Sequence, residues 1–403
     1  MPRPATFDPG LISDPALRPL AEKVASGERF TADDGIRLFS TADIVGLGAM
    51  ADAANRARHG DRVFFAANQH INPTNVCILR RTCVFCSYAR LPKEEGAYRY
   101  TLEQVLQEAA TANSTLTREF HIVGGLDMKA GLDYYRDMFQ ALKSSFPHVH
   151  IKALTAVEVA HIARIEKMSV REVLLSLREA GLDTMPGGGA EVFSPGVRAT
   201  IADKKLAGEE WIAVHREAHA LGIRTNCTML YGHVETIEDR IAHLSMLREL
   251  QDETGGFLAY IPLAYHPDNN ELGHALKREG TATSAFDDLK NLAVGRLFLD
   301  NIDHIKTHWV MVTPFVSQAS LHFGVNDMEG TMVREKIYHE AGAHTAQSMT
   351  LSQILKLIRG AGKRPVERDS FYRVLRTFDG EDPTPNSGGS ARGTTERQPA
   401  EAA

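Results

Sequence analysis

The stretch Ile71–Arg90, INPTNVCILRRTCVFCSYAR, holds three of the four cysteines in a chain of 403 residues. Cys77, Cys83 and Cys86 are separated by five and then two residues, and the fourth cysteine, Cys227, lies far away. Four cysteines cannot form the framework of a disulfide-stapled domain in a chain this long. The clustering therefore indicates a metal site in a reducing compartment.

Short apolar runs alternate with helical patterns on both sides of this stretch. The runs are Val63–Ile71, Phe120–Val123, Val149–Leu154, Leu182–Met185, Ile223–Tyr231, Phe257–Leu263, Ile305–Val312 and Leu321–Val325. The helical segments between them are Leu102–Ala112, Leu132–Ser144, Val170–Ala180, Glu209–Leu221, Ile237–Thr254 and Ala285–Asn301. This alternation predicts an α/β fold of parallel strands with crossover helices. Eight runs favour a TIM-type (βα) barrel, and a partial barrel of six strands is the alternative because the eighth run is weak.

Three regions follow from the pattern. Residues 1–62 are expected to be an N-terminal helical extension, and residues 63–378 the barrel with C-terminal helices. After Phe378 there is no large apolar residue, and Gly, Pro, Ser and Thr dominate. Such a composition cannot bury enough surface to order itself, so residues 379–403 are expected to be a disordered tail.

The bulk composition excludes several classes of protein. A hydrophobic content of 43% and a charged content of 24% are ordinary for a soluble globular protein. The net charge of −6 argues against a general nucleic-acid binder. No apolar stretch approaches the length of a membrane span, and the N-terminus has no apolar signal region. We expect a cytoplasmic protein with no nucleic-acid partner and no membrane insertion.

Polar and glycine-rich segments follow the apolar runs. They read NPTNVC, GGLD, TAVE, PGGGAE, YGHVET, AYHPDNN and NDMEGT. In a (βα) barrel these segments lie at the carboxyl ends of the strands, where active sites form. The pattern predicts an enzyme site on this rim.

Three kinds of site could use the clustered thiols. A structural zinc site needs a fourth Cys or His close by, and His70 is the nearest candidate. A redox pair of Cys83 and Cys86 leaves Cys77 unexplained. A [4Fe–4S] cluster on three thiolates leaves one iron open for a further ligand. We favour the cluster, because an open iron suits a position just after the first strand.

A loop with three cysteines after the first strand of a (βα) barrel resembles the radical SAM superfamily. The resemblance implies that S-adenosylmethionine (SAM) chelates the open iron and is cleaved to a 5′-deoxyadenosyl radical. The usual spacing is three and then two residues, so this chain has two extra residues between Cys77 and Cys83. Phe85 matches the aromatic position near the adenine. The pair Gly124 and Gly125 matches the glycines that approach the methionine amino group.

Two more SAM contacts are implied by the resemblance. Glu191, in PGGGAE, is expected to accept hydrogen bonds from the ribose hydroxyls. Arg216, on the following helix, is expected to pair with the methionine carboxylate.

Further segments resemble the aminofutalosine synthase family of menaquinone biosynthesis. They are HIVGGL, IKALTAVE, PGGGAEVF, TNCTMLYGH, LQDETGGF, IPLAYHP, RLFLDNIDHIK and AGKRPVERD. The resemblance implies that the deoxyadenosyl radical adds to the enolpyruvyl double bond of 3-[(1-carboxyvinyl)oxy]benzoate. The products would be 6-amino-6-deoxyfutalosine, methionine and bicarbonate, so SAM is consumed. A reduced flavodoxin or ferredoxin would supply the electron.

The implied substrate carries two carboxylates, so donors on the rim are expected to bind it. His233 and His266, each after a strand, are the expected catalytic histidines. The candidate substrate ligands are His70, Asn72, Asn75, Lys152, Asn301 and Lys306.

Two alternatives stay open. A sister radical SAM enzyme, either dehypoxanthine futalosine cyclase or the FO synthase subunit, would keep the barrel and the cysteines but change the substrate pocket. A zinc-stabilised binding protein without catalysis is the more distant alternative.

Overall fold

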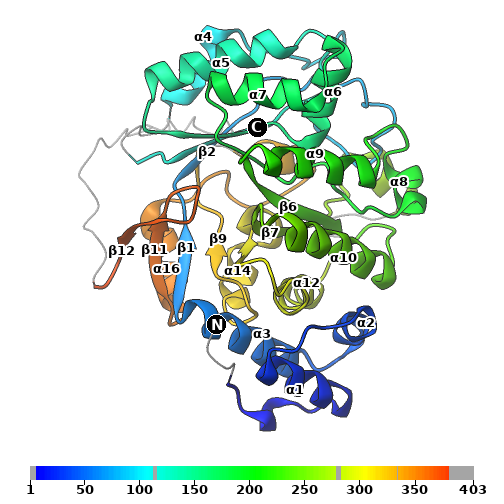
Figure 1. Cartoon of the computed structure of the whole chain (residues 1–403), viewed down its shortest axis with the longest axis vertical. Helices are drawn as coiled ribbons and strands as arrows, with labels where there is room; N and C mark the ends of the chain where they lie inside the picture. Colours follow the sequence, from blue (N-terminus) through cyan, green and yellow to red (C-terminus); the bar gives the residue numbers. More distant parts are fainter. Residues whose placement is uncertain (1–5, 112–115, 278–282, 334, 381–403) are drawn as a thin grey trace, which may run out of the picture.

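A curled sheet lies at the centre of the computed structural model, which describes residues 6–111, 116–277, 283–333 and 335–380 (Figure 1). The sheet has the order β10-β2-β3-β4-β5-β6-β7-β8-β9-β1-β11-β12. Its strands are β1 (Arg62–Phe65), β2 (Asn68–Ile71), β3 (Glu119–Ile122), β4 (His150–Ala153), β5 (Thr184–Met185), β6 (Arg224–Tyr231), β7 (Phe257–Ala264), β8 (His304–Thr307), β9 (Asp327–Met328), β10 (Thr331–Val333), β11 (Arg364–Arg368) and β12 (Val374–Thr377).

Helices cover the outside of this sheet. They are α1 (Arg18–Ser26), α2 (Ala32–Ser40), α3 (Ile44–His59), α4 (Leu102–Ala110), α5 (Leu132–Ser145), α6 (Ala156–Glu166), α7 (Val170–Ala180), α8 (Pro195–Ile201), α9 (Gly208–Ala220), α10 (Ile237–Thr254), α11 (Glu271–Leu276), α12 (Ala285–Phe298), α13 (Trp309–Val312), α14 (Pro314–Ser320), α15 (Ile337–Glu340) and α16 (Leu351–Gly360). Two short 3-10 helices, Pro9–Leu11 and Pro15–Leu17, precede α1.

Two broken strands bring the ends of the barrel together. Only Ala66 and Ala67 separate β1 from β2, and only Glu329 and Gly330 separate β9 from β10. β9 pairs in parallel with β1, and β10 pairs in parallel with β2, so the last strand runs beside the first. Taken as one strand each, β1–β2 and β9–β10 are the first and eighth positions, with β3 to β8 between them. The predicted (βα) barrel is confirmed.

The eighth strand lies later in the chain than predicted. The run Leu321–Val325 forms the turn after α14, and the strand begins at Asp327. Leu321 and Val325 are fully buried, so the apolar run reflects the burial of a turn. The run Ile305–Val312 also divides, because β8 ends at Thr307 and α13 begins at Trp309.

Capping side chains define most helix starts. Thr155, for example, caps α6 by accepting the N–H of Glu158, while the Glu158 carboxylate accepts the N–H and the hydroxyl of Thr155. The six predicted crossover helices are present within a few residues of their expected ends, as α4, α5, α7, α9, α10 and α12. The helices of the barrel therefore follow from local signals in the chain.

Additions at both ends of the chain pack on the barrel. Helices α1 to α3 lie below it, where α3 packs on α12 and α2 packs on α10 (Figure 1). The C-terminal helices α15 and α16 are followed by β11 and β12, an antiparallel pair beside β1 that was not predicted. The sequence did not predict β11 because this strand contains Pro365, and proline has no N–H to donate to a neighbouring strand. The expected tail from residue 379 lies outside the described residues from residue 381 onward.

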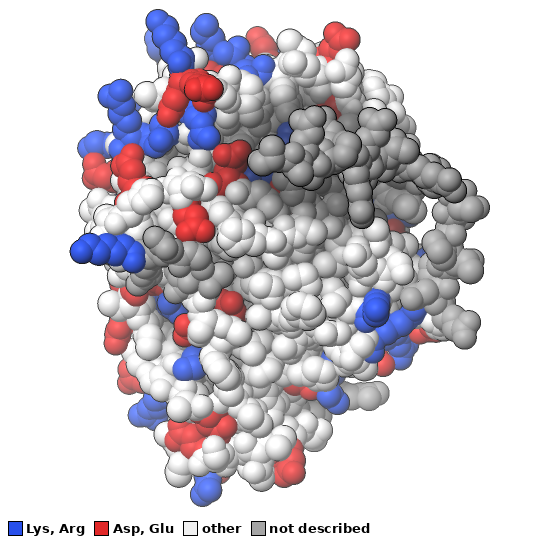
Figure 2. All heavy atoms as spheres, turned by 180° about the vertical axis from the view of Figure 1, so that it is seen from behind, with Lys and Arg blue, Asp and Glu red and all other residues white. Residues whose placement is uncertain are grey.

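The surface carries charges of both signs. Where atoms are described on the face seen in Figure 2, basic and acidic side chains interleave around the edge, and the centre holds few of them. Within the described ranges, no helix combines the length and the apolar character that crossing a bilayer requires.

Candidate active site

The three clustered cysteines lie in the loop after β2, at the carboxyl end of the first barrel strand. Cys83 is buried, and Cys77 and Cys86 are partly buried. All three line one cavity of about 310 Å³ that extends into the barrel. The N–H of Cys77 donates to the carbonyl of Arg90 at 2.9 Å, which ties the loop to its own returning segment.

The enlarged gap between the first two cysteines forms a compact turn. The N–H of Arg80 donates to the carbonyl of Cys77 at 3.2 Å. The N–H groups of Thr82 and Cys83 both donate to the carbonyl of Leu79 at 2.9 Å. The extra residues are therefore taken up in the turn, and Cys83 still reaches the cavity.

The donor set is three thiols that border one cavity, which is the kind of donor set that a [4Fe–4S] cluster uses. In the described part of the chain, no three His, Cys, Asp or Glu side chains gather as ligands of one ion. The thiolates of a [4Fe–4S] cluster each ligate a different iron, so they need only border a common space. Burial raises the pKa of the Cys83 thiol to about 12, while Lys205 acts in the opposite direction. Such a thiol releases its proton when it binds a metal as a thiolate.

The glycine pair after β3 packs directly against the cysteine loop. The N–H of Gly125 donates to the carbonyl of Thr74 at 2.9 Å. A Cβ on Gly125 would lie 2.2 Å from the carbonyl oxygen of Val76, and one on Gly124 would lie 2.9 Å from that of Thr74. Only glycine permits this approach. The N–H of Gly124 donates to the carboxylate of Glu158 at 2.9 Å.

A buried ion pair lies across the cavity mouth. Glu191, which follows β5, accepts from the ammonium of Lys205 at 2.6 Å. Burial opposes the charge of Lys205, but Glu191 raises the pKa of this ammonium above its usual value. Lys205 also lies over the ring of Phe85, 5.3 Å from its centroid. Glu191 has a φ of 49°, a backbone conformation that costs energy for a residue other than glycine and is frequent at functional sites.

A row of polar side chains crosses the barrel interior below the mouth. His70, His121 and Lys152 occupy paired positions on β2, β3 and β4. The rings of His70 and His121 stack, with centroids 4.8 Å apart. The ammonium of Lys152 donates to Glu119 at 2.7 Å. Although burial alone would raise the pKa of Glu119, Lys152 holds it well below its usual value, so the pair is ionised.

A second ion pair completes the interior. Lys306 of β8 pairs with Glu329, which also accepts from the amide of Asn68. His308 follows β8, and its Nε2 lies 3.9 Å from Glu329. Burial lowers the pKa of His308 to about 4, so its ring is neutral near pH 7.

Most of the expected site residues line this one cavity. His266 is among them, and its Nε2 lies 3.1 Å from the carbonyl of Met311, to which it donates. The others are Cys77, Cys83, Cys86, Phe85, Gly124, Gly125, Glu191, His70, Lys152 and Lys306. The structure brings these side chains together, and their roles stay predictions.

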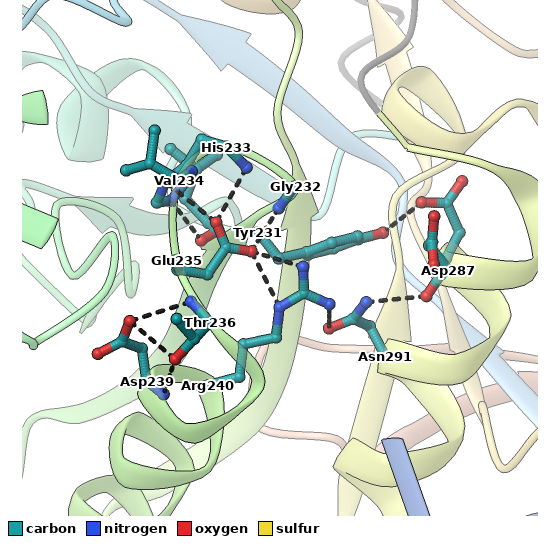
Figure 3. A network of polar contacts seen from close by, with 12 residues as sticks. Tyr231, Gly232, His233, Val234, Glu235, Thr236, Asp239, Arg240, Asp287 and Asn291 are labelled. Atoms are coloured by element: carbon teal, nitrogen blue, oxygen red, sulfur yellow. Dashed lines mark hydrogen bonds and ion pairs between the residues drawn. The ribbon is translucent and has the colours of Figure 1, made fainter. Parts of the chain in front are cut away.

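Two expected site residues lie elsewhere. Arg216 projects from α9 to solvent, where it pairs with Glu253 at 2.7 Å, so the structure does not bring it to the cavity where SAM is expected. His233 is folded into the loop after β6 beside Glu235 and Arg240 (Figure 3). Its Nδ1 accepts from the N–H of Val234, and its Nε2 donates to the carbonyl of Leu230 in β6, so the ring ties the loop to the end of this strand outside the cavity.

Three asparagines also hold backbone instead of lining the cavity. The side-chain amide of Asn72 donates to the carbonyl of Val123 at 2.9 Å. The side-chain amide of Asn75 donates to the carbonyl of Gly96, and its oxygen accepts the N–H of Tyr98. Asn301 donates to the carbonyl of Arg248. The structure places them outside the cavity lining, and their expected part in substrate binding stays a prediction. The polar loops after barrel strands need such bonds to satisfy their own backbone.

Sequence reasoning missed several cavity residues. Side chains on a strand point alternately inward and outward. His121 and His308 continue the inward positions of β3 and β8, so this alternation could have predicted both residues. The others are Glu158, Lys205, Glu335 and Tyr338, which come from loops and helices. Glu158 ends the predicted rim segment TAVE, whereas we find no local signal for the other three, because only the folded chain brings them to the cavity.

Comparisons with known proteins cover nearly the whole chain. The profile of the radical SAM superfamily matches residues 71–247, and one described as the CofH/MqnC C-terminal region matches residues 254–379. The chain is 45% identical over 368 residues to the aminodeoxyfutalosine synthase of Thermus thermophilus, covering 91% of this chain and 98% of that one. It is 41% identical over 372 residues to the aminodeoxyfutalosine synthase of Streptomyces coelicolor, covering 91% and 96%.

A solved structure shows the same fold. The crystal structure of methylornithine synthase superposes with a TM-score of 0.69 at 18% identity, covering 86% of this chain and 97% of that one. At this identity the likeness concerns the fold alone.

Proposed function

This chain belongs to the radical SAM superfamily, in its aminodeoxyfutalosine synthase family, and we propose that it joins the deoxyadenosyl group of SAM to 3-[(1-carboxyvinyl)oxy]benzoate. The expected products are 6-amino-6-deoxyfutalosine, methionine and bicarbonate, in menaquinone biosynthesis. One observation carries the proposal: a single cavity has three thiols at its mouth and a row of ionised and neutral polar groups in its interior.

The residues at the mouth are assigned to the cluster and SAM. Cys77, Cys83 and Cys86 would hold a [4Fe–4S] cluster, which supplies the electron that cleaves SAM. Gly124 and Gly125 line the cavity and pack directly on the cysteine loop, and they are the proposed contacts of the methionine part. A reduced flavodoxin or ferredoxin is the proposed electron donor.

The walls of the cavity keep the reacting groups dry. Between the mouth and the interior the lining is largely apolar, with residues that include Val123, Leu126, Val157, Ile261 and Leu263. A wall of this kind excludes water, which protects reactive intermediates and holds the alkene close to the attacking carbon. The two ends of the cavity thus separate the chemistry from substrate recognition.

An anaerobic assay with SAM, dithionite and the enolpyruvyl benzoate tests the function. Mass spectrometry is expected to find 6-amino-6-deoxyfutalosine. Release of 5′-deoxyadenosine without an adduct would contradict the proposal. That outcome would point to one of the sister enzymes, to which the match with the CofH/MqnC C-terminal region also points.

A pair of cysteine variants tests the ligand set. Cys83→Ala is expected to lose most bound iron and activity, because two thiolates cannot hold the cluster as three do. Cys227→Ala is the matched control, since Cys227 lies on β6 outside the cavity and donates to Ala259. Zinc without iron in anaerobically purified protein would instead support the zinc-stabilised alternative.

A further inference from the structure

Two buried imidazoles line the cavity, and the described residues leave one ring nitrogen of each without a hydrogen-bond partner. His70 and His308 are both 8% exposed, and both line the cavity. Within the part of the chain that the structure describes, the Nε2 of His70 and the Nδ1 of His308 have no hydrogen-bond partner. The two rings meet edge to face, with centroids 6.4 Å apart. A buried polar atom without a partner is costly, so two such atoms at one cavity indicate a ligand.

The neighbouring cations are already engaged. Lys152 pairs with Glu119, and Lys306 pairs with Glu329. Each pair balances one positive charge with one negative charge, so neither ammonium is a free counter-ion for a bound anion. The two histidines are therefore the groups that can adapt to such an anion, because either ring nitrogen can carry a hydrogen.

The position of these two rings relative to the cysteine loop indicates which end of the substrate they contact. His70 lies within β2 and His308 directly after β8, whereas the cysteine loop begins beyond Ile71. The alkene must lie at the mouth, near the three thiols, for adenosylation to occur. The ring carboxylate is attached meta to the enol ether oxygen, so it can extend away from the alkene toward the barrel interior.

We propose that His70 and His308 together bind the ring carboxylate of the enolpyruvyl benzoate and so select an aryl carboxylate as substrate. The inference rests on the proposed function and deepens it. Each imidazole donates one N–H to the carboxylate, and no covalent step is involved. A carboxylate buried without such donors would lose its hydration uncompensated.

Binding and turnover of two compounds test the subsite. The first is the full substrate, and the second is 2-phenoxyacrylate, which lacks only the ring carboxylate. His70→Leu and His308→Leu are each expected to lower the affinity and kcat/KM for the full substrate by about 10- to 100-fold. The same variants are expected to change both quantities for 2-phenoxyacrylate by less than about threefold.

Conservative variants separate hydrogen bonding from packing. His70→Gln keeps a donor near the position of Nε2, and His308→Asn keeps one near Nδ1, so both are expected to recover much of the loss. His322→Leu is the control, because His322 lies on the surface against the carbonyl of Ala361. Equal losses for both compounds, or no loss for the full substrate, would overturn the proposal.

Calorimetry without SAM and reductant distinguishes this proposal from the proposed function. Selective loss of substrate binding in the leucine variants, with no adduct formed by the wild-type enzyme, would support the subsite and refute the reaction. Adduct formation with no selectivity between the two compounds would support the reaction and refute the subsite. Thermal melts identify any variant that fails to fold, and the glutamine and asparagine variants then decide.

Discussion

Gly125 determines how closely the cysteine loop approaches the second unit of the barrel. Its missing side chain leaves the carbonyl of Val76 in the place that a Cβ would occupy. The neighbouring carbonyl of Thr74 accepts the N–H of Gly125 at 2.9 Å. The loop that carries the thiols is therefore positioned by a backbone contact that no other residue permits.

Gly125→Ala is expected to displace the cysteine loop. A Cβ at 2.2 Å from a backbone oxygen cannot be accommodated by a side-chain shift, so the cost is about 1–3 kcal/mol or more. Iron content after reconstitution and activity should both fall at least about tenfold. Arg216→Ala is the control, because Arg216 is exposed and lies outside the cavity. Full iron loading of Gly125→Ala would contradict this assignment.

His233 and His266 show what single residues cannot reveal. Both follow a barrel strand, and both are mostly buried. Only His266 lines the cavity, because the loop around His233 turns inward on Glu235 and Arg240. The sequence predicted both equally, since the direction of a side chain in a loop depends on contacts made after folding.

At the scale of elements, the broken strands β1–β2 and β9–β10 hold the barrel together. Gly330 lies between β9 and β10, and the N–H of Asn68 donates to its carbonyl at 3.4 Å. A Cβ on Gly330 would lie 2.0 Å from the carbonyl of Ala66, in the break between β1 and β2. The two breaks therefore fit into each other.

Gly330→Ala is expected to destabilise the fold by about 1–3 kcal/mol, because the added methyl group would force these strands apart. Urea unfolding measures the change in the free energy of unfolding. Gly196→Ala is the matched control, since Gly196 lies in α8 with no atom of the described residues within 4 Å of an added Cβ. This control should be neutral or stabilising by up to about 1 kcal/mol. An unchanged stability of Gly330→Ala would show that the two breaks do not support each other.

At the scale of the whole molecule, burial keeps many histidines neutral. The chain has 17 histidines, and burial lowers the pKa of several of them to about 3 or 4, as at His59, His150, His219, His243 and His308. His243 lies outside the cavity, where its Nε2 donates to the carbonyl of Thr228 at 2.9 Å. Its pKa falls from 6.5 to about 3.

His243→Gln is expected to reduce the acid sensitivity of folding. Below pH 6.5 the unfolded chain binds a proton at His243, while the folded chain does not until about pH 3, so stability falls with pH. Between pH 7.5 and 5.5 the wild-type protein should lose about 1.4 kcal/mol more than the variant. Urea unfolding at both pH values measures this difference. Equal losses would mean that His243 is already charged in the folded protein.

The alternation of strands and helices, the rim of polar loops and the loop of three cysteines were all predictable from the amino-acid sequence. These features depend on local periodicity, capping and spacing, which are properties of the chain before it folds. Folding, by contrast, places His121, Lys205 and His308 in the lining of the cavity and leaves Arg216 and His233 outside it. These placements depend on which distant segments meet and on the partners that each side chain finds there. No local pattern in the chain encodes such contacts.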